Sequence, residues 1–397
     1  MNRQLIVFYM SCLLAFVAGH TVNYSVIIFA QDVLRSDLLS GIGFALCFGP
    51  PIIFGWYAGA LCDRLAPGRI IIFSQLVFVI AGVLLYFAAT GIISDTIRSI
   101  LLIIAAFLAG VGWSFVAPAR FAALAQLSEP EKIHGATILL NLQTMLGFGI
   151  APILIALLQG TFGWKGVFLM IIASFALASV LMFWSPTQPT PKQKSHPLQD
   201  IQEGIRAVLA KPLLLQFLLA NLMAYLLMGP MQVLLPRIAS SQLSLEGMER
   251  GLYLGILALA LLIGGVLCMA LRRRIHDGRT ILVGTFIAGL AIAALSQISA
   301  PLLSGVVLMA AGIIGGMVVS LIVAGLQAET APDVRGRVMS MFTISCQVVP
   351  AASGFMAGVL SEYFGVVTAM LLCGNVIALI AIAGLIRLPA VRQYGRA

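Results

Sequence analysis

Polar side chains recur at helical spacing inside the first long apolar stretch of the chain. His20, Tyr24 and Gln31 follow one another at intervals of 4 and 7 residues. Residues 4, 7 and 11 positions apart share one face of a helix, so these side chains form a stripe, with Asn23 at its edge. Imidazole, phenol and amide groups bind solutes by hydrogen bonds, and an imidazole exchanges a proton near neutral pH. The stripe therefore predicts a polar pathway along an apolar helix.

The same pattern returns in the seventh apolar stretch. Its members are Asn221, Tyr225, Met228 and Gln232, displaced from the first stripe by 221 − 20 = 201 residues. The same offset relates further pairs of residues, which are Gln126 with Gln327 and Gly135 with Gly336. Two related halves around a central pathway are an architecture for moving a solute by rocking one half against the other. We therefore expect a cavity at mid-membrane between the two stripes.

Other polar residues within apolar stretches extend the candidate pathway. Gln143 and Gln347 are candidates for further solute contacts, but such groups also bond neighbouring membrane helices. Binding and packing stay open for both, and for Asn23. An intramembrane ionisable group suggests function, which makes His20 the first candidate for proton coupling, with a neutral imidazole bonded across helices as the alternative. Asp32, near the outer end of the first span, is the second candidate, with a solvated end residue as its alternative.

The elements that carry these residues are membrane helices. The chain is 61% hydrophobic and 9% charged, with a mean hydropathy of +1.07, which excludes a soluble domain of 397 residues. About 20 apolar residues cross a bilayer as a helix, and continuous rather than alternating runs exclude a barrel. Twelve spans are predicted, at residues 5–30, 38–61, 69–93, 100–122, 137–159, 165–184, 212–236, 251–271, 280–299, 301–326, 338–361 and 365–387.

Charge and composition define the orientation and the domains. Most Lys and Arg residues fall on one side of the predicted spans, which indicates cytoplasmic termini by the positive-inside rule. The net charge of +9 then belongs to an inner face that meets anionic lipid, and not to a nucleic-acid surface.

Residues 1–184 and 212–397 form the predicted halves. The polar segment 185–211 is the linker, and it carries a short amphipathic helix that we expect to lie along the membrane.

A loop motif resembles a known transporter family. The segment between the second and third spans reads GALCDRLAPGR over residues 59–69. It resembles the G-x-L-a-D-R-x-G-R loop of the major facilitator superfamily, with one extra residue before Gly68. The matching loop of the second half, LRRRIHDGR over residues 271–279, has Arg273 where the first has Asp63. The resemblance implies two six-helix halves and a charged conformational gate.

The gate candidates are charged residues at the inner ends of the spans, namely Asp63, Arg64, Arg69, Arg120, Glu129, Arg335 and Arg337. Arg120 closes the fourth span close to Glu129. The sequence favours either an ion pair between them at the gate or an Arg120 side chain that reaches the interface.

Further motifs resemble one branch of that superfamily, the enterobactin exporters and their drug-exporter relatives. They are Pro118-Ala-Arg120, Gly163-Trp164-Lys165, Glu203-Gly204-Ile-Arg206 and Pro332-Asp333-x-Arg335-Gly336-Arg337. The likeness implies a monomeric exporter of the bacterial inner membrane, driven by protons, for a siderophore or drug-like solute. Ala106 replaces the usual antiporter Arg of span four, and the span-five glycine motif is weakened. An importer of a metal chelate or nutrient is therefore the alternative, followed by a lipid flippase and a non-transporting sensor.

Catalytic and cofactor motifs are missing from the sequence. No Ser-His-Asp arrangement, metal-ligand spacing or phosphate-binding loop occurs, and the six cysteines show no paired spacing. The sequence thus predicts no enzyme, no metal and no cofactor. The expected partners are a small solute, protons and membrane lipids.

Overall fold

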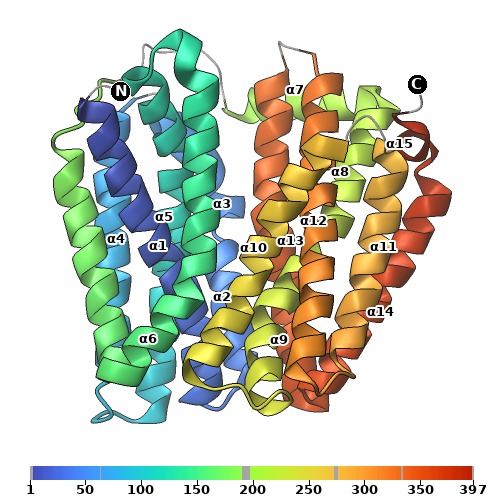
Figure 1. Cartoon of the computed structure of the whole chain (residues 1–397). Helices are drawn as coiled ribbons and strands as arrows, with labels where there is room; N and C mark the ends of the chain where they lie inside the picture. Colours follow the sequence, from blue (N-terminus) through green and yellow to red (C-terminus); the bar gives the residue numbers. More distant parts are fainter. Residues whose placement is uncertain (1–2, 63, 190–196, 272–275, 332–333, 396–397) are drawn as a thin grey trace. The chain divides into compact units, whose positions relative to one another are not determined.

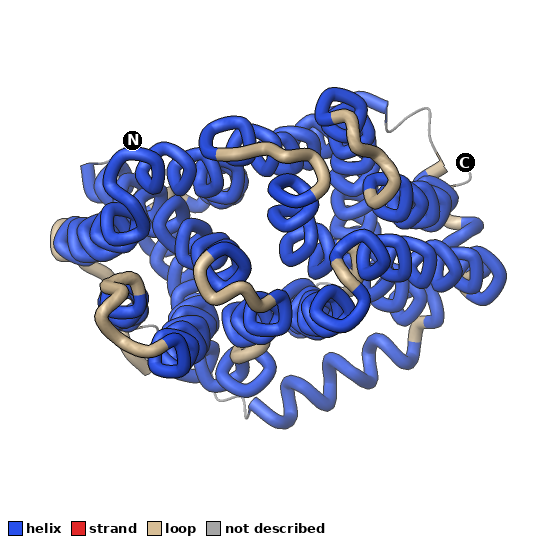
Figure 2. Tube along the Cα trace, turned by 90° about the horizontal axis from the view of Figure 1, so that it is seen from below, coloured by secondary structure: helices blue, strands red, loops and turns tan. Residues whose placement is uncertain are grey.

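The computed structural model describes residues 3–62, 64–189, 197–271, 276–331 and 334–395. Every regular element in these ranges is helical (Figure 2). Eleven described stretches are long and apolar enough to cross a membrane. One of them, Gly135–Met182, contains both the fifth and the sixth predicted span. The expectation of an all-helical membrane protein is confirmed.

The chain forms two compact units. The first comprises Met1–Lys194 and Glu246–Gly255. Its helices are α1 (Arg3–Asp32), α2 (Asp37–Phe48), α3 (Pro51–Cys62), α4 (Pro67–Ala88), α5 (Asp95–Leu127), the short 3-10 helix η1 (Pro130–Lys132) and α6 (Ile133–Met182). Within this unit α1 packs along α6, and α4 packs along α5 (Figure 1). Helix α1, which carries the first polar stripe, thus packs chiefly against α6.

The second unit comprises Ser195–Leu245 and Ile256–Ala397. Its helices are α7 (Pro197–Ala210), α8 (Pro212–Tyr225), α9 (Met228–Ser241), α10 (Gly247–Leu271), α11 (Asp277–Leu295), α12 (Pro301–Glu329), α13 (Arg335–Phe364), α14 (Val366–Arg387) and α15 (Pro389–Gln393). Here α8 and α9 pack on α13, as α1 packs on α6 in the first unit. Helix α10 begins in the first unit and ends in the second (Figure 1).

Proline interrupts two of the predicted spans. Span two is divided into α2 and α3 at Pro50 and Pro51, because neither residue has an amide hydrogen to continue the helix. Span seven is divided into α8 and α9 at residues 226–227. There Pro230 cannot donate to the carbonyl of Leu226 four residues earlier. Spans five and six are separated inside α6 by Gly163, whose φ of 66° suits glycine.

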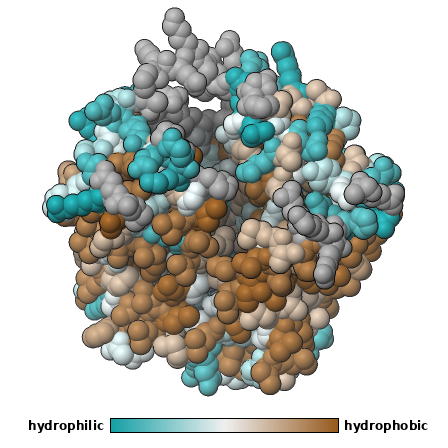
Figure 3. Space-filling model, turned by 45° about the horizontal axis from the view of Figure 1, so that its top comes forward, coloured by the Kyte–Doolittle hydropathy of each residue, from teal (hydrophilic) through white to brown (hydrophobic). Residues whose placement is uncertain are grey.

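Hydrophobic side chains cover much of the surface. On the face drawn in Figure 3, hydrophobic residues (brown) form a broad belt, and hydrophilic residues (teal) gather towards the ends. Large apolar side chains such as Ile53, Phe73 and Leu379 are exposed. A soluble protein would bury such groups, so the belt is suited to contact with lipid.

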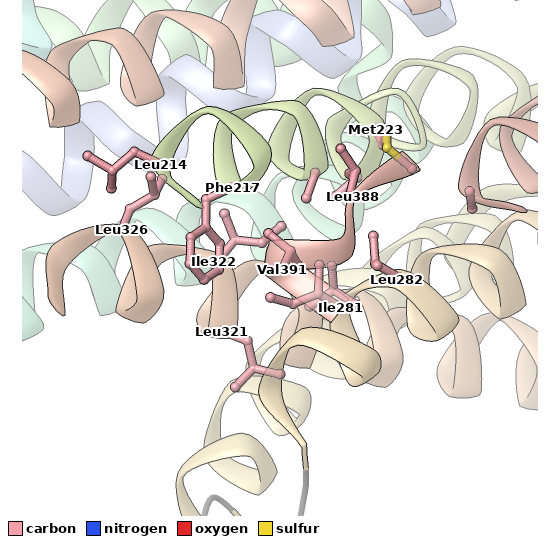
Figure 4. Close-up of a cluster of buried hydrophobic side chains, with 14 of the residues drawn as sticks. Leu214, Phe217, Met223, Ile281, Leu282, Leu321, Ile322, Leu326, Leu388 and Val391 are labelled. Atoms are coloured by element: carbon pink, nitrogen blue, oxygen red, sulfur yellow. The ribbon is translucent and has the colours of Figure 1, made fainter. Parts of the chain in front are cut away.

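A packed hydrophobic cluster stabilises the second unit. Phe217 of α8, Ile281 of α11 and Ile322 of α12 are fully buried in it (Figure 4). The ring of Phe217 also meets the ring of Tyr394, with 5.0 Å between their centroids. Because lipid is as apolar as these side chains, close packing rather than escape from water holds the helices together.

Removal of one methyl group from this cluster tests the packing. Ile322→Val is expected to lower the free energy of unfolding by about 0.5–1.5 kcal/mol, because a small void remains in a tightly packed site. Ile287→Val is the matched control, since the Ile287 side chain is exposed, and its effect should stay within about 0.5 kcal/mol. Unfolding of the purified protein in detergent measures both. Equal losses for the two variants would contradict a packed cluster.

Candidate functional site

The polar stripe of α1 lies against aromatic side chains of α5 and α6. The ring of His20 is 5.5 Å from that of Trp113 and 5.5 Å from that of Phe148, measured between centroids. The Nε2 atom of His20 is buried and has no hydrogen-bond partner among the described residues. Tyr24, one turn further along α1, packs against Phe148 at 5.6 Å. Tyr24 is therefore an inner residue of the unit and does not face lipid.

Amide side chains bond to other helices of this unit. The Nε1–H of Trp113 donates to Oδ1 of Asn23 over 3.4 Å. The Nε2–H of Gln143 donates to the backbone carbonyl of Tyr9 over 3.1 Å, while its Oε1 is buried and has no partner in the described part of the chain. Both amides thus bond neighbouring helices, and their role in binding a solute stays a prediction. Gln31 lies three turns along α1 from His20 and donates to the Ser40 hydroxyl over 3.3 Å.

Arg120 lies deep in the same unit, two turns along α5 from Trp113. The residue is 2% exposed, and its Nε and Nη1 atoms have no hydrogen-bond partner in the described parts of the chain. The guanidinium carbon lies 4.0 Å from the centre of the Phe16 ring and 6.0 Å from that of Trp113. Rings hold a cation by their quadrupole but cannot neutralise its charge.

The structure differs from both sequence interpretations of the Arg120 side chain. Glu129 forms an ion pair with Lys132 instead, with 2.6 Å between Oε2 and Nζ. The hydrogen bond from Lys132 also lowers the pKa of Glu129 below its usual value. Arg120 is 2% exposed, and its side chain packs under the Phe16 ring instead of extending to the surface of the unit. Helix geometry explains the difference, because Glu129 lies beyond the end of α5 beside the next charged turn.

The second unit carries the counterpart of the α1 stripe. Asn221 is fully buried, donates to the hydroxyl of Ser345 over 2.7 Å, and leaves its Oδ1 without a partner among the described residues. Tyr225 is half-buried, with its ring 6.3 Å from that of Phe342 on α13. Met228 and Gln347 are half-buried and Gln232 is buried. The structure brings Asn221 and Tyr225 together against α13, whereas Gln232 lies further along α9.

Asp32 forms an ion pair with Arg250 of α10. The two Nη atoms of Arg250 lie 2.6 and 3.3 Å from the carboxylate oxygens, a two-pronged arrangement. The Arg250 side chain is 13% exposed and that of Asp32 is 25% exposed. Asp32 thus lies at a helix end, as the sequence suggested, but its carboxylate is paired with a cation rather than only solvated. The pair joins the end of α1 to the first turn of α10, within the first unit.

The first turns of α10 also press closely on α6. A Cβ atom added to Gly251 would lie 2.7 Å from Cβ of Ala156 and 2.9 Å from the carbonyl oxygen of Pro152. Such distances leave no space for any side chain at position 251. Next to the Asp32–Arg250 pair, the backbone of α10 at Gly251 therefore packs in direct contact with α6.

The remaining gate candidates lie at the helix ends. Asp63 lies outside the described residues, while Arg64 and Arg69 are exposed. Arg335 donates to the backbone carbonyl of Thr330 over 3.2 Å. Arg337 forms an ion pair with Glu203 of the amphipathic helix α7, with 2.8 Å between Nη1 and Oε2. Their roles as gate residues stay predictions.

The Glu203–Arg337 pair connects the linker helix to α13 at an exposed position. Glu203→Ala is expected to lower the free energy of unfolding by less than about 1 kcal/mol, because solvent screens pairs of this exposure. Thermal unfolding in detergent is the measurement, and Glu131→Ala is the matched control at another exposed acid. A loss well above the control would show that docking of α7 depends on the pair.

Several residues of the site escaped the sequence analysis. Trp113 and Phe148 contact His20 from other helices, and Arg250 partners Asp32 across 218 residues of sequence. Trp113 and Arg120 are seven residues apart, so both lie on one face of the same helix. This spacing was the one indication in the sequence that the two side chains lie together. Nothing in the sequence indicated the partner of Asp32.

Comparison with known proteins identifies the family. A sequence model described as Major Facilitator Superfamily matches residues 8–354. The chain belongs to the major facilitator superfamily. No curated protein matched the chain in a sequence search. The chain is thus a multi-pass membrane transporter by family, and the expected fold class is confirmed.

Solved transporters share this major facilitator fold. A bacterial homologue of the human lysosomal transporter Spinster, in an inward-facing, unoccupied conformation, is 15% identical with a TM-score of 0.79, covering 99% of this chain and 98% of that one. A POT family transporter in complex with 5-aminolevulinic acid is 12% identical with a TM-score of 0.75, covering 98% and 97%. A mutant of the nucleoside transporter NupG is 13% identical with a TM-score of 0.74, covering 97% and 99%. At these identities the likeness concerns the fold alone.

Proposed function

We propose that this chain is a secondary active transporter that exports a small amphipathic organic solute across a bacterial inner membrane. The observation that carries the proposal is that His20 and Gln143 of the first unit have buried polar atoms without partners in the described residues, and that the His20 ring lies 5.5 Å from that of Trp113. Unpaired polar atoms inside a membrane protein are costly unless a solute or water occupies them. Membership of a transporter superfamily supports this assignment.

Export as the direction rests on the sequence resemblance to enterobactin and drug exporters. The cargo proposed on that likeness is a siderophore or a drug-like compound. The two stripes, led by His20 and Asn221, would line the pathway, and the solute would move as the halves rock. The closing contact at one end would be the docking of α10 on α1 and α6, through Asp32, Arg250 and Gly251. By the positive-inside rule this end is the outer one.

Direction and cargo can be tested together. Cells lacking the protein should retain inside, and fail to release, a metabolite that wild-type cells export, most clearly under iron limitation. Inverted vesicles should then accumulate that metabolite when a proton gradient is imposed, and a protonophore should abolish the accumulation. Accumulation by right-side-out vesicles instead would reverse the direction and support the importer, which the replacement of the antiporter Arg by Ala106 favours. No difference in any metabolite would refute transport.

His20 is the proposed proton site, because its Nε2 atom is buried in the cluster without a partner among the described residues. His20→Gln keeps a polar side chain of similar reach but cannot titrate between pH 5 and 8. It is expected to reduce accumulation driven by a pH gradient at least about threefold, while exchange of solute without a gradient persists. The matched control is His276→Gln, since His276 is exposed just before α11 and lies outside the cluster. Undiminished pH-driven accumulation in His20→Gln would exclude this residue from coupling.

A further inference from the structure

Arg120 is a buried charge of the cluster that packing does not explain. Its residue exposure is 2%, and Nε and Nη1 are without hydrogen-bond partners in the described residues. A guanidinium carries its charge at all working pH values, so this site holds a permanent positive charge inside the membrane domain. Burial of a charge without a counterion is strongly unfavourable. Such a charge persists in a protein when a function requires it.

No carboxylate in the helices around Arg120 supplies the missing counterion. In the sequence, α3, α4 and α6 contain no acidic residue, and α1, α2 and α5 have theirs only at their ends, Asp32, Asp37 and Asp95. Asp32 is paired with Arg250 and Asp95 with Arg98. Among the described residues, the rings of Phe16 and Trp113 lie beside the Arg120 guanidinium, and neither ring can neutralise its charge.

Aromatic rings lie beside the Arg120 guanidinium. Phe16 covers the guanidinium at 4.0 Å, and Trp113 lies beyond it at 6.0 Å. Trp113 in turn lies 5.5 Å from His20 between ring centroids, so cation, indole and imidazole form one continuous cluster. Apolar rings beside an unpaired, forked donor suit a molecule with an apolar body and a planar oxyanion.

We propose that Arg120 binds the anionic group of the transported solute, which makes the cargo a small amphipathic organic anion bearing a carboxylate or a similar oxyanion. The proposal rests on the proposed function, because it assigns the substrate class of that site. The guanidinium would donate two hydrogen bonds to the oxyanion, while Phe16 and Trp113 contact the apolar body. An anionic cargo also suits export, since an inside-negative membrane potential drives negative charge outwards.

The second unit has no positive charge at the position that matches Arg120. The residue at the repeat offset from Arg120 is Leu321, because 120 + 201 = 321, and Leu321 is buried in the hydrophobic cluster. The positive charge is therefore present in one unit and absent from the matching position of the other.

Equilibrium binding to the full chain in neutral detergent tests the proposal. The probes are 2-naphthoate and 2-naphthamide, which share one ring system and differ in charge. Wild-type protein is expected to bind the anion at least about tenfold more tightly than the amide, and Arg120→Gln should lose that preference. Arg120→Lys should retain part of it, because it keeps the charge but not the fork.

Arg98→Gln is the matched control, since Arg98 also lies over a ring, that of Phe29 at 5.7 Å, but is paired with Asp95. It should keep the full preference for the anion. The ligand-free Arg120→Gln protein should unfold at a temperature no lower than wild type, because the substitution removes an uncompensated charge. A structural role would instead lower that temperature.

Three outcomes would overturn the proposal: equal binding of the two probes by wild type, a preserved preference in Arg120→Gln, or an equal loss of preference in Arg98→Gln. If Arg120→Gln fails to fold, the proposal is tested by the preference of wild type and of Arg120→Lys for 2-naphthoate over 2-naphthamide. Anion binding without solute flux in vesicles would sink the proposed function alone. Flux of a neutral solute without anion preference would sink this inference alone.

Discussion

Arg250→Glu, which reverses the charge at this position, is expected to reduce transport about 10- to 100-fold. The reason is that the substitution disfavours the proposed state in which α10 docks on α1. Arg250 contacts both carboxylate oxygens of Asp32, at 2.6 and 3.3 Å, with both side chains mostly shielded from solvent. Hydrogen bonds between charged groups contribute about 1.5–3 kcal/mol, and about 1.4 kcal/mol changes a population tenfold. The variant loses this attraction and adds repulsion between two carboxylates.

The charge swap separates a specific pair from a general charge effect. Asp32→Arg combined with Arg250→Asp should restore most of the rate, because the pair can form in the opposite sense. Arg35→Glu is the matched control, since Arg35 is exposed at the same end of the first unit, and it should leave the rate unchanged. Transport of the cargo in vesicles is the measurement. Full activity of Arg250→Glu would show that the pair plays no part in the cycle.

Adding side-chain volume at position 251 is the second change with a large expected effect. Gly251→Val places atoms where a Cβ alone would already lie 2.7 Å from Ala156 and 2.9 Å from the Pro152 carbonyl. Overpacking of this kind costs about 1–3 kcal/mol, and the backbone of α6 cannot move aside as a flexible side chain would. We expect transport to fall at least about tenfold, because the docked state of α10 becomes unfavourable.

A control in the same helix isolates the contact. An added Cβ at Gly265 would lie 3.4 Å from the Ser320 hydroxyl, an ordinary contact distance. Gly251→Ala should therefore impair transport, whereas Gly265→Ala should be neutral or slightly stabilising through its better helix propensity. Labelling of Ile153→Cys, beneath Gly251, with a membrane-impermeant maleimide reports docking directly. Labelling that does not increase in the Gly251→Val background would contradict the proposed closing contact.

The candidate site could be predicted only in part from the sequence. The stripe of His20, Asn23 and Tyr24 was found because a helix has a constant period, and side chains 4 residues apart share a face. Its neighbours Trp113 and Phe148 were missed, because they lie on α5 and α6, and hydropathy does not reveal which faces of two apolar helices meet. The sequence also suggested an ion pair of Arg120 with Glu129, a nearby acid along the chain, whereas the structure pairs Glu129 with Lys132.

The amino-acid sequence alone determined that this protein is a helical membrane transporter of two repeated halves, because hydropathy, helical period and repeat offset are all properties read along the chain. Tertiary structure decided which charges are paired. It joined Asp32 to Arg250 across 218 residues, and it placed the Arg120 guanidinium against the rings of Phe16 and Trp113. These contacts depend on how helices distant in sequence pack against one another, and close packing in a membrane is a property of complementary surfaces rather than of composition.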